Sequence, residues 1–559
     1  MTDESWPCYW DPRRVERTDE RLDADLCVYG GSSAGITAAV QAARLGLSVV
    51  LLHPGWRIGG MTTNGLGWTD AGVRQGVGGL ARQFYREVGS YYNMHERWFF
   101  EPHVAMDIYT KWLHEEEAIA VRPGQFLESA ELDRGRLTGV RMTSGLTVRA
   151  RQFIDATYEG DLMAAAGVAY TVGREANRVY NETLNGVQEH KKHQFERPVS
   201  PYKVAGDPAS GLLPGVEAGP REVDGAGDHR VQAYCFRICL TDDPANRLDL
   251  LKPAGYDRSE YELLARYFQA GWGDMLFRKF DRLTRHKTDV NNYGAVSSDF
   301  IGRNHAWPEA DHATRQRLYH EHLTYHLGLL WFLANDPATP ASIREPMRQW
   351  GRCRDEFVET AGWPEQLYVR EGRRMVSDYV TTEHDCLGKT AIEDSVALAS
   401  YGIDSHNARR FVRDGEVRNE GNVQAPVSGA YAIAYRSIVP AAGQCENLIV
   451  PVCLSSSHTA FGSIRMEPVF MILGQSAATA AALAIDSGRA VQRIDERALR
   501  RELLAQGQVL DPTAVPDYAT LIREGRCTGN RDAADNPQSV PEHVPAESMQ
   551  PRREMLVQR

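Results

Sequence analysis

The chain has 559 residues, of which 42 % are hydrophobic and 25 % are charged, so it is long enough for two or more domains around a large buried core. Its formal net charge of −11 argues against nucleic acid or an anionic membrane as the main partner. Nine cysteines without paired spacing favour a reduced compartment, and the acidic first residues do not resemble a secretory signal. We therefore expect a cytoplasmic protein that binds a small-molecule substrate, no nucleic acid and no membrane, with a homodimer as the candidate assembly.

A strand-turn-helix-strand pattern opens the ordered region of the chain. Leu26–Tyr29 is a short apolar run typical of a buried strand, and a glycine-rich turn follows at Gly30–Gly35. Apolar residues then recur at helical spacing over Ile36–Ala43, before a second apolar strand at Val49–Leu52. This order predicts a βαβ unit whose first turn binds phosphate.

The first turn carries a variant of the glycine pattern that places a dinucleotide pyrophosphate at a helix N-terminus. Gly30 and Gly35 occupy the first and third glycine positions, whereas Ser32 stands at the middle one. An acidic residue usually follows the second strand and holds the adenosine ribose, but this chain has His53 there. A neutral imidazole can still hydrogen-bond to a ribose hydroxyl, so His53 stays a candidate ligand. The alternative is an ordinary glycine turn in an α/β protein.

A second glycine-rich segment runs from Arg57 to Gly67 and continues to Asp70. Small residues at this density suit a backbone that passes close to a large flat ligand. The two segments together resemble the FAD-dependent oxidoreductases of the glutathione-reductase-like superfamily. More narrowly, the IGGM and GLGWTD sequences resemble those of a bacterial FAD-dependent oxidoreductase family. The resemblance implies FAD as the cofactor, with Gly59 and Gly60 running past its pyrophosphate toward the isoalloxazine ring.

Two later segments extend the resemblance. Ile119–Asp155 alternates apolar and polar residues and predicts an antiparallel meander. In the superfamily such a meander returns to the sheet through a strand that ends in an Ala-Thr step, which Ala156 and Thr157 match. A strand over Asn447–Leu454 then leads into an Ala-rich apolar helix over Val469–Ile485, which we expect to be a core helix and not a membrane span. The resemblance implies that this helix N-terminus points at the pyrimidine end of the flavin, where it stabilises the negative charge of the reduced ring.

Together these elements predict an α/β fold, with a Rossmann-like FAD-binding domain, a βββ meander and an inserted α+β substrate or cap domain. Within the insertion we expect a strand over Tyr234–Leu240 and helices over Arg315–Ala334 and Ile343–Thr360. No second glycine-rich βαβ unit is present in the middle, so we expect no NAD(P)H domain. The predicted divisions are an N-terminal arm (1–23), the first segment of the FAD-binding domain (24–172), the substrate/cap domain (173–440), the second segment of the FAD-binding domain (441–495), a C-terminal helical segment (496–527) and a disordered tail (528–559).

Hydride transfer from a substrate C–H bond to flavin N5 requires a base for the proton of the adjacent O–H or N–H group. His458 is the first candidate, because its loop is expected to face the flavin, and His406 and His103 follow. The alternative is that His458, Arg465 and Glu467 only fasten one another. The expected FAD contacts are Gly30, Gly31, Ser32, Ser33, Ala34, Gly35, His53, Arg57, Gly59, Gly60, Met61, Thr62, Gly65, Leu66, Ala156, Thr157, Ser463, Arg465, Met466 and Glu467.

His322 and His326 lie one helical turn apart, a spacing that can hold zinc. No further ligand stands at a recognisable spacing, so we favour a helix face and expect no metal.

Clusters of hydrogen-bonding side chains, such as Asn291–Gly294 and Ser400–Asn407, suit a hydroxylated or amine-bearing substrate. We therefore expect an FAD-dependent dehydrogenase or oxidase that oxidises a polar small molecule by hydride transfer to flavin N5. Two alternatives remain open: an FAD enzyme of redox-neutral elimination or isomerisation, and a non-catalytic dinucleotide-binding protein.

Overall fold

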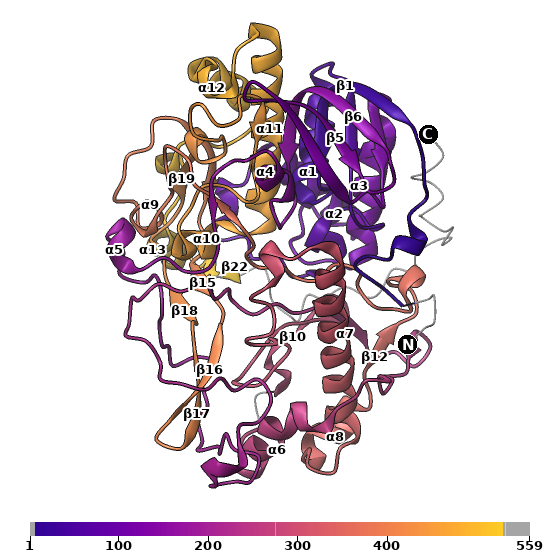
Figure 1. The fold of residues 1–559 in the computed structure, drawn as a ribbon, viewed down its shortest axis with the longest axis vertical. Coiled ribbons are helices and arrows are strands. Elements are labelled where there is room, and N and C mark those ends of the chain that lie inside the picture. Colours follow the sequence, from indigo (N-terminus) through magenta and orange to yellow (C-terminus); the bar gives the residue numbers. More distant parts are fainter. Residues whose placement is uncertain (1–5, 274–275, 529–530, 533–559) are drawn as a thin grey trace.

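The structure, a computed structural model, describes residues 6–273, 276–528 and 531–532 (Figure 1). Its largest sheet has the strand order β3-β2-β1-β6-β5-β4, with β20 paired to the end of β6. β1 lies parallel to β2 on one side and to β6 on the other, and β3 continues the parallel arrangement beyond β2. This is the predicted Rossmann-like α/β arrangement. The strands are β1 (Arg21–Tyr29), β2 (Val49–Leu52), β3 (Ile119–Arg122), β4 (Leu127–Asp133), β5 (Arg136–Met142), β6 (Thr147–Asp155) and β20 (Leu448–Ile449).

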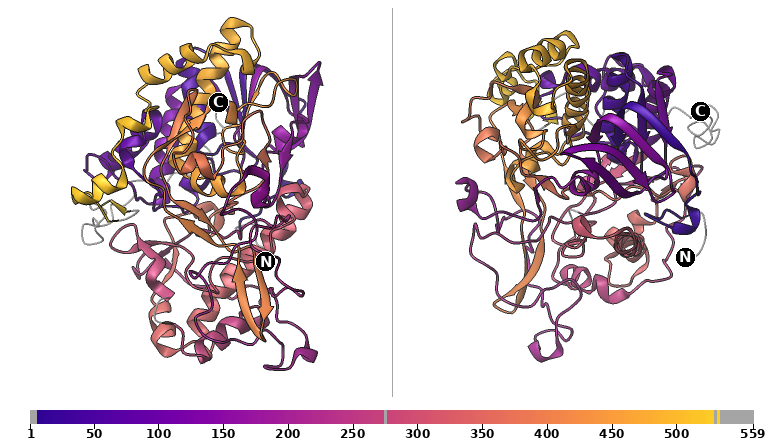
Figure 2. Two further views of the ribbon diagram at one scale, coloured as in Figure 1. Left: turned by 90° about the vertical axis from the view of Figure 1, so that its left-hand side faces the viewer. Right: turned by 45° about the horizontal axis from the view of Figure 1, so that its top comes forward.

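Successive residues of β1 point to opposite faces of the sheet, and each face has its own core. Leu26 and Val28 belong to the large core that the sheet shares with the helices, whereas Cys27 and Tyr29 pack in a second core with residues of the meander. Figure 2 shows the N-terminal helices and the yellow C-terminal helices on one side of the sheet and the meander strands on the other. Both faces of the central strand are therefore covered, as a parallel sheet requires.

The predicted three-stranded meander is correct and consists of β4, β5 and β6, but the range given for it begins too early, at Ile119. Ile119 of β3 pairs in parallel with Val49 of β2, so β3 belongs to the parallel sheet. The helices α2 (Gly79–Tyr91) and α3 (Pro102–Glu115) lie between these two strands in the sequence and provide the crossover. β6 serves both the meander and the parallel sheet, since its first residues pair with β5 and its last residues with β20.

Two helices distant in sequence pack tightly behind this sheet. α1 (Ser33–Arg44) lies against α11 (Glu467–Ser487), and a Cβ atom on Gly474 of α11 would lie 2.1 Å from the Ala34 carbonyl oxygen. The Thr37 hydroxyl donates a hydrogen bond to the Met471 carbonyl at 2.8 Å. α11 is apolar and long enough to cross a membrane, but 94 % of its most apolar 18-residue stretch is buried inside the protein. It is thus a core helix, as predicted.

A five-stranded sheet with the order β10-β11-β8-β12-β9 forms within the predicted insertion. The long helix α7 (His312–Asn335) lies beside it in the lower half of Figure 1, with α6 (Glu262–Gln269) and α8 (Ala341–Met347) below. The sheet comprises β8 (Ile238–Thr241), β9 (Arg247–Leu248), β10 (Phe280–Arg282), β11 (Lys287–Val290) and β12 (Gly351–Cys353).

Two sequence predictions for this region need correction. The helix expected over Ile343–Thr360 ends at Met347, because Pro346 cannot continue the hydrogen-bond ladder, and the chain then enters β12. The strand expected over Tyr234–Leu240 begins only at Ile238. The domain boundaries themselves stay a prediction.

The remaining elements are short and connect these layers. They are α4 (Asp161–Ala165), β7 (Tyr170–Thr171), α5 (Asn177–Tyr180), β13 (Arg374–Met375), α9 (Glu383–Cys386), β14 (Ser395–Ala399), β15 (Ile403–Ser405), β16 (Arg409–Arg413), β17 (Glu416–Glu420), β18 (Val423–Ala425), β19 (Tyr431–Ala434), α10 (His458–Ile464), α12 (Glu496–Ala505), α13 (Tyr518–Arg523), β21 (Cys527–Thr528) and β22 (Arg531–Asp532).

The N-terminal arm docks on its own chain. The ring of Tyr9 lies 5.0 Å from that of Trp307 and 5.5 Å from that of Phe126, and the Trp10 N–H donates to Gln316 at 2.9 Å. At the other end, β21 and β22 pair across the start of the predicted tail, and residues 529–530 and 533–559 lie outside the described residues.

Candidate functional site

The segments predicted to bind FAD meet at the N-terminus of α1. The Gly59 N–H donates to the Gly31 carbonyl at 2.6 Å, which joins the loop after β2 to the loop after β1. The Ser32 hydroxyl donates to the Ala156 carbonyl at 2.7 Å, which adds the end of β6. Three segments that are far apart in sequence thus lie side by side.

The backbone of this junction fits a dinucleotide pyrophosphate. Gly30 has a φ of +106°, and a Cβ atom there would lie 2.6 Å from the Ala156 carbonyl carbon. A Cβ atom on Gly35 would lie 1.8 Å from the Gly30 carbonyl oxygen, so neither position accepts a side chain. Ser33 and Ala34 are buried in the first turn of α1, where N–H groups have no partner within the helix and attract an anion.

Ser32 replaces the middle glycine without blocking the turn. Its hydroxyl faces inward, where it donates to Ala156 and accepts from the Gly35 N–H at 3.3 Å. The side chain therefore caps α1 from the protein side and leaves the phosphate side of the loop to the backbone.

His53 does not offer a free acceptor at the ribose position. Its Nδ1 accepts the Gly31 N–H at 3.1 Å, and its Nε2–H faces the Arg57 carbonyl at 3.2 Å. Burial lowers the pKa of His53 to about 4, so the ring is neutral at pH 7. Both ring nitrogens are thus engaged with the backbone.

A tyrosine that the sequence analysis did not select links two of the predicted segments. The Tyr158 hydroxyl accepts the Met61 N–H at 3.0 Å and donates to Glu467 Oε1 at 2.7 Å. Glu467 Oε2 accepts from the Thr62 hydroxyl at 2.9 Å, and burial raises the pKa of this carboxyl. Glu467 therefore joins the start of α11 to the loop after β2.

Arg465 turns away from Glu467 toward β15. Its Nη1 donates to the Tyr368 hydroxyl at 2.8 Å, and its Nη2 lies 3.1 Å from Asp404 Oδ2. Its buried Nε–H has no hydrogen-bond partner among the described residues, so it is available to a ligand oxygen. The alternative in which His458, Arg465 and Glu467 fasten one another is wrong, because each of them has other partners.

His458 is enclosed at the start of α10. Its Nδ1 lies 2.7 Å from Glu371 Oε2, and its Nε2 lies 3.1 Å from the Ser405 hydroxyl. Burial, followed by the positive charges of Arg374 and Arg174, lowers the pKa of His458 to about 3. With both nitrogens occupied and 1 % of its surface exposed, the ring acts as a packing element between β15 and α10.

His406 differs from His458 because its side chain is not fully enclosed. It keeps 12 % of its side-chain surface accessible, and the neighbouring Asp404 keeps 23 % although it lies deep in the protein. His406 Nδ1 lies 2.7 Å from Asp299 Oδ2, and its Nε2 lies 3.4 Å from Asp404 Oδ2. Both ring nitrogens of His406 therefore face carboxylates.

Asp70 and Tyr401 lie near Asp404 and Arg465. Both are half-buried yet lie deep in the protein. Burial raises the pKa of Asp70, and Arg237 and Lys279 oppose this only from a distance, since each has its own partner aspartate. Asp70 forms no ion pair with any residue that the structure describes. It ends the GLGWTD segment, the signal from which sequence analysis could have selected it.

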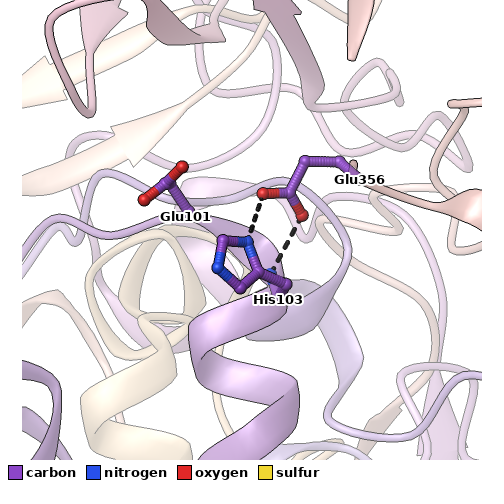
Figure 3. Close-up of side chains that lie close together, drawn as sticks. All are labelled: Glu101, His103 and Glu356. Carbon is purple, nitrogen blue, oxygen red and sulfur yellow. Dashed lines mark hydrogen bonds and ion pairs between the residues drawn. The ribbon is translucent and has the colours of Figure 1, made fainter. Parts of the chain in front are cut away.

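His103 belongs to an ion cluster behind this segment (Figure 3). Its Nδ1 lies 2.6 Å from Glu356 Oε1, and its backbone N–H donates to Glu356 Oε2 at 3.0 Å. Glu101 completes the group of potential metal ligands that the described residues form. Lys287 Nζ lies 2.8 Å from Glu101 and 2.9 Å from Glu356, so a lysine supplies the counter-charge that a cation would bring. All three labelled side chains are buried, which favours a structural role for His103.

The two histidines of α7 bond to their own helix. His322 Nδ1 lies 2.8 Å from the Leu318 carbonyl, and His326 Nδ1 lies 2.7 Å from the His322 carbonyl. Burial lowers the pKa of both rings, to about 3 and about 4. This favours the helix-face interpretation over a zinc site.

The other predicted FAD contacts are placed by contacts within the protein. Arg57 Nε donates to the Thr63 carbonyl at 2.8 Å, and the Thr157 hydroxyl donates to Asp155 at 2.6 Å. Ser463 accepts from the Tyr431 hydroxyl at 2.6 Å and donates to the Tyr401 carbonyl. Gly65 lies against the Arg237 backbone, and the other apolar contacts are buried: Met61, Leu66 and Met466.

A family model described as FAD dependent oxidoreductase matches residues 25–503. No curated protein matches the chain. Among solved structures, T. acidophilum thioredoxin reductase is 21 % identical over 24 % of this chain and 34 % of that chain (TM-score 0.16). Aquifex aeolicus GidA is 15 % identical over 32 % and 36 % (TM-score 0.22), and the FAD-complexed glycerol-3-phosphate dehydrogenase of Bacillus halodurans is 14 % identical over 26 % and 36 % (TM-score 0.20). The chain thus matches about a third of the length of each of these structures.

Proposed function

Because the chain belongs to the FAD-dependent oxidoreductase family and uses FAD as its cofactor, we propose that it oxidises a hydroxylated or amine-bearing small molecule by hydride transfer to flavin N5. The bound flavin supplies the acceptor for the hydride, that is, for two electrons and one proton of the substrate C–H bond. The chain's own residues then have to bind the substrate and take the second proton.

The polar cluster beside Arg465 is the observation that supports this proposal. Asp70, Tyr401, Asp404 and His406 supply its hydrogen-bonding groups, and all four are partly buried. Arg465 follows α10 and precedes α11, the helix expected to point at the flavin, and brings its unpaired Nε–H to this region. A polar substrate fits such a lining better than an apolar one does.

Asp70 is the proposed base. With bound FAD to accept the hydride, the Asp70 carboxylate would take the proton of the adjacent O–H or N–H group, and the substrate would be left with a C=O or C=N bond. Asp70 suits this step because burial raises its pKa toward the working pH while no ion pair with a described residue occupies it. Among the predicted histidines, His103 and His458 are enclosed and His406 lies between two carboxylates.

The reductive half-reaction tests the proposal. The purified yellow protein is mixed anaerobically with a panel of polyols, hydroxy acids and primary amines, and the loss of oxidised flavin absorbance is followed by stopped flow. We expect Asp70→Asn to slow bleaching by a substrate from the panel by roughly 10²- to 10⁴-fold and to leave FAD bound. The wild-type rate should rise with pH through the raised pKa of Asp70, because only the carboxylate accepts a proton, and the variant should lose this rise.

Asp133→Asn is the matched control, since Asp133 is exposed in the meander turn, and it should bleach at the wild-type rate. Bleaching by dithionite but by no member of the panel would contradict the proposed substrate class. Conversion of a panel compound without net bleaching, even at stoichiometric substrate, would favour the redox-neutral alternative. An unchanged rate in Asp70→Asn would remove Asp70 from the mechanism.

A further inference from the structure

Arg410 of β16 is a buried arginine without a counter-ion among the described residues. It is 5 % exposed, and within that part of the chain its guanidinium makes a single hydrogen bond, from Nη2 to the Ala295 carbonyl at 3.1 Å. Its buried Nε–H has no partner there. Burial lowers the pKa of Arg410, because no paired carboxylate offsets the cost of burying its charge. A buried arginine normally has such a carboxylate partner.

The carboxylates that act on Arg410 belong to other arginines. Asp299 and Glu260 raise its pKa only from a distance. Asp299 Oδ1 lies 2.8 Å from Arg370 Nη2, and Glu260 Oε1 lies 3.0 Å from Arg303 Nη2. When these charges are paired, the positive charge of Arg410 is left over.

The residue opposite Arg410 in the hairpin carries a buried acceptor without a partner. Arg410 pairs with Asn419 of β17, and Asn419 Nδ2 donates to the same Ala295 carbonyl at 2.9 Å. The guanidinium and the amide therefore lie side by side. Asn419 is 1 % exposed, and its Oδ1 has no hydrogen-bond partner among the described residues. An unmet donor and an unmet acceptor thus lie next to each other, and both are costly to leave unpaired.

Space adjoins the guanidinium. A Cβ atom built on Gly215 would lie 3.4 Å from Arg410 Nη1, and no other described atom outside the adjacent residues would lie within 4 Å of it. Gly215 is itself partly exposed, so this side of the guanidinium lies near the surface. Because protein interiors are close-packed, space beside a buried charge indicates room for a small ligand.

We propose that Arg410 and Asn419 form a binding site for a small anion that also carries an O–H or N–H donor, the chemistry of a hydroxy acid or an amino acid. The anionic group accepts from the free N–H groups of Arg410, and the donor of the ligand reaches Asn419 Oδ1. The fold does not need the charge, since the Ala295 carbonyl keeps its bond from Asn419 when Arg410 is replaced. This site does not rest on the proposed function.

Binding of 2-hydroxyisobutyrate to the FAD-loaded full-length protein tests the proposal. Its hydroxyl carbon bears no hydrogen, so it cannot transfer a hydride, and isothermal titration calorimetry then measures binding alone. Pivalate keeps the carboxylate and lacks the hydroxyl, and we expect it to bind roughly three- to tenfold more weakly, the effect of one neutral hydrogen bond. Arg410→Met should weaken binding of 2-hydroxyisobutyrate by roughly ten- to hundredfold, because it removes a charge-assisted contact.

Arg413→Met is the control, because Arg413 lies on the same strand with 42 % of its side chain exposed and pairs with Glu189. It should keep the wild-type affinity. Equal affinity of the wild type and Arg410→Met, or no saturable binding by the wild type, would overturn the proposal and leave water as the partner of these groups. If circular dichroism shows that Arg410→Met does not fold, Arg410→Gln, which keeps a donor for the Ala295 carbonyl, takes its place with the same expectation.

Discussion

Lys287 is the residue whose charge the ion cluster of Figure 3 depends on. Its Nζ lies within 2.9 Å of carboxylate oxygens of Glu101, Asp355 and Glu356, and 1 % of its side chain is exposed. We expect Lys287→Met to lower the free energy of unfolding by about 3–5 kcal/mol, because it leaves buried carboxylates without their counter-charge. Urea titration followed by tryptophan fluorescence measures this. Lys111→Met, at a lysine with 58 % of its side chain exposed, should change stability by less than about 0.5 kcal/mol. A loss of similar size in both variants would contradict the argument.

The sequence predicts some site residues and not others because local and distant constraints differ. Gly30 and Gly35 can be recognised from the sequence, because a phosphate-binding turn requires glycine at specific local positions. Asp70 lies in a segment that the sequence marks, but its special environment depends on Tyr401, far along the chain. Arg410 carries no local signal, because the Ala295 carbonyl that it binds lies 115 residues away. Only the fold brings such groups together.

At the scale of elements, the crossing of α1 and α11 determines how the two ends of the FAD-binding region meet. A Cβ atom on Gly474 would lie 2.1 Å from the Ala34 carbonyl and 2.5 Å from the Thr37 hydroxyl. We expect Gly474→Ala to push the helices apart, to cost about 1–3 kcal/mol of stability and to weaken FAD binding, since Ala34 lies in the first turn of α1. Thermal unfolding and flavin fluorescence titration measure the two effects. Ser487→Ala, at the exposed end of α11, should change neither stability nor FAD affinity. If Gly474→Ala also left both unchanged, the crossing would tolerate a methyl group and the argument would be contradicted.

The same scale explains which elements the sequence predicts. α1, α7 and α11 follow from long apolar periodicity, and the structure confirms them. The range predicted for the meander begins too early, at Ile119, because a four-residue run such as β3 cannot reveal which neighbour it pairs with. The helix expected over Ile343–Thr360 ends just after Pro346, because proline interrupts the helix despite the amphipathic pattern around it.

At the scale of the whole molecule, the chain leaves the parallel sheet after β6, builds the cap region and returns through β20, α10 and α11. Contacts within the protein already join these regions, since Glu467 binds Thr62 and Asn64 binds the backbone of Glu365. A ligand that touches all of these segments stabilises them together, because its binding free energy is lost whenever any one of them opens. Because these segments are distant in the sequence, amide hydrogen exchange can be measured in each of them separately, which makes the coupling measurable.

Removal of FAD should therefore loosen distant segments at once. We expect deflavinated protein to melt at a lower temperature and to lose amide hydrogen-exchange protection in residues 30–35, 57–67, 363–367 and 463–467. The hairpin of β16 and β17, whose five consecutive residue pairs lie outside these segments, should keep its protection. Added FAD should restore both the melting temperature and the protection, which controls for damage during flavin removal. Protection lost at residues 30–35 and kept at 463–467 would mean that the two ends of the chain do not share one cofactor. Protection lost only at residues 363–367 would instead place the cofactor in the cap region.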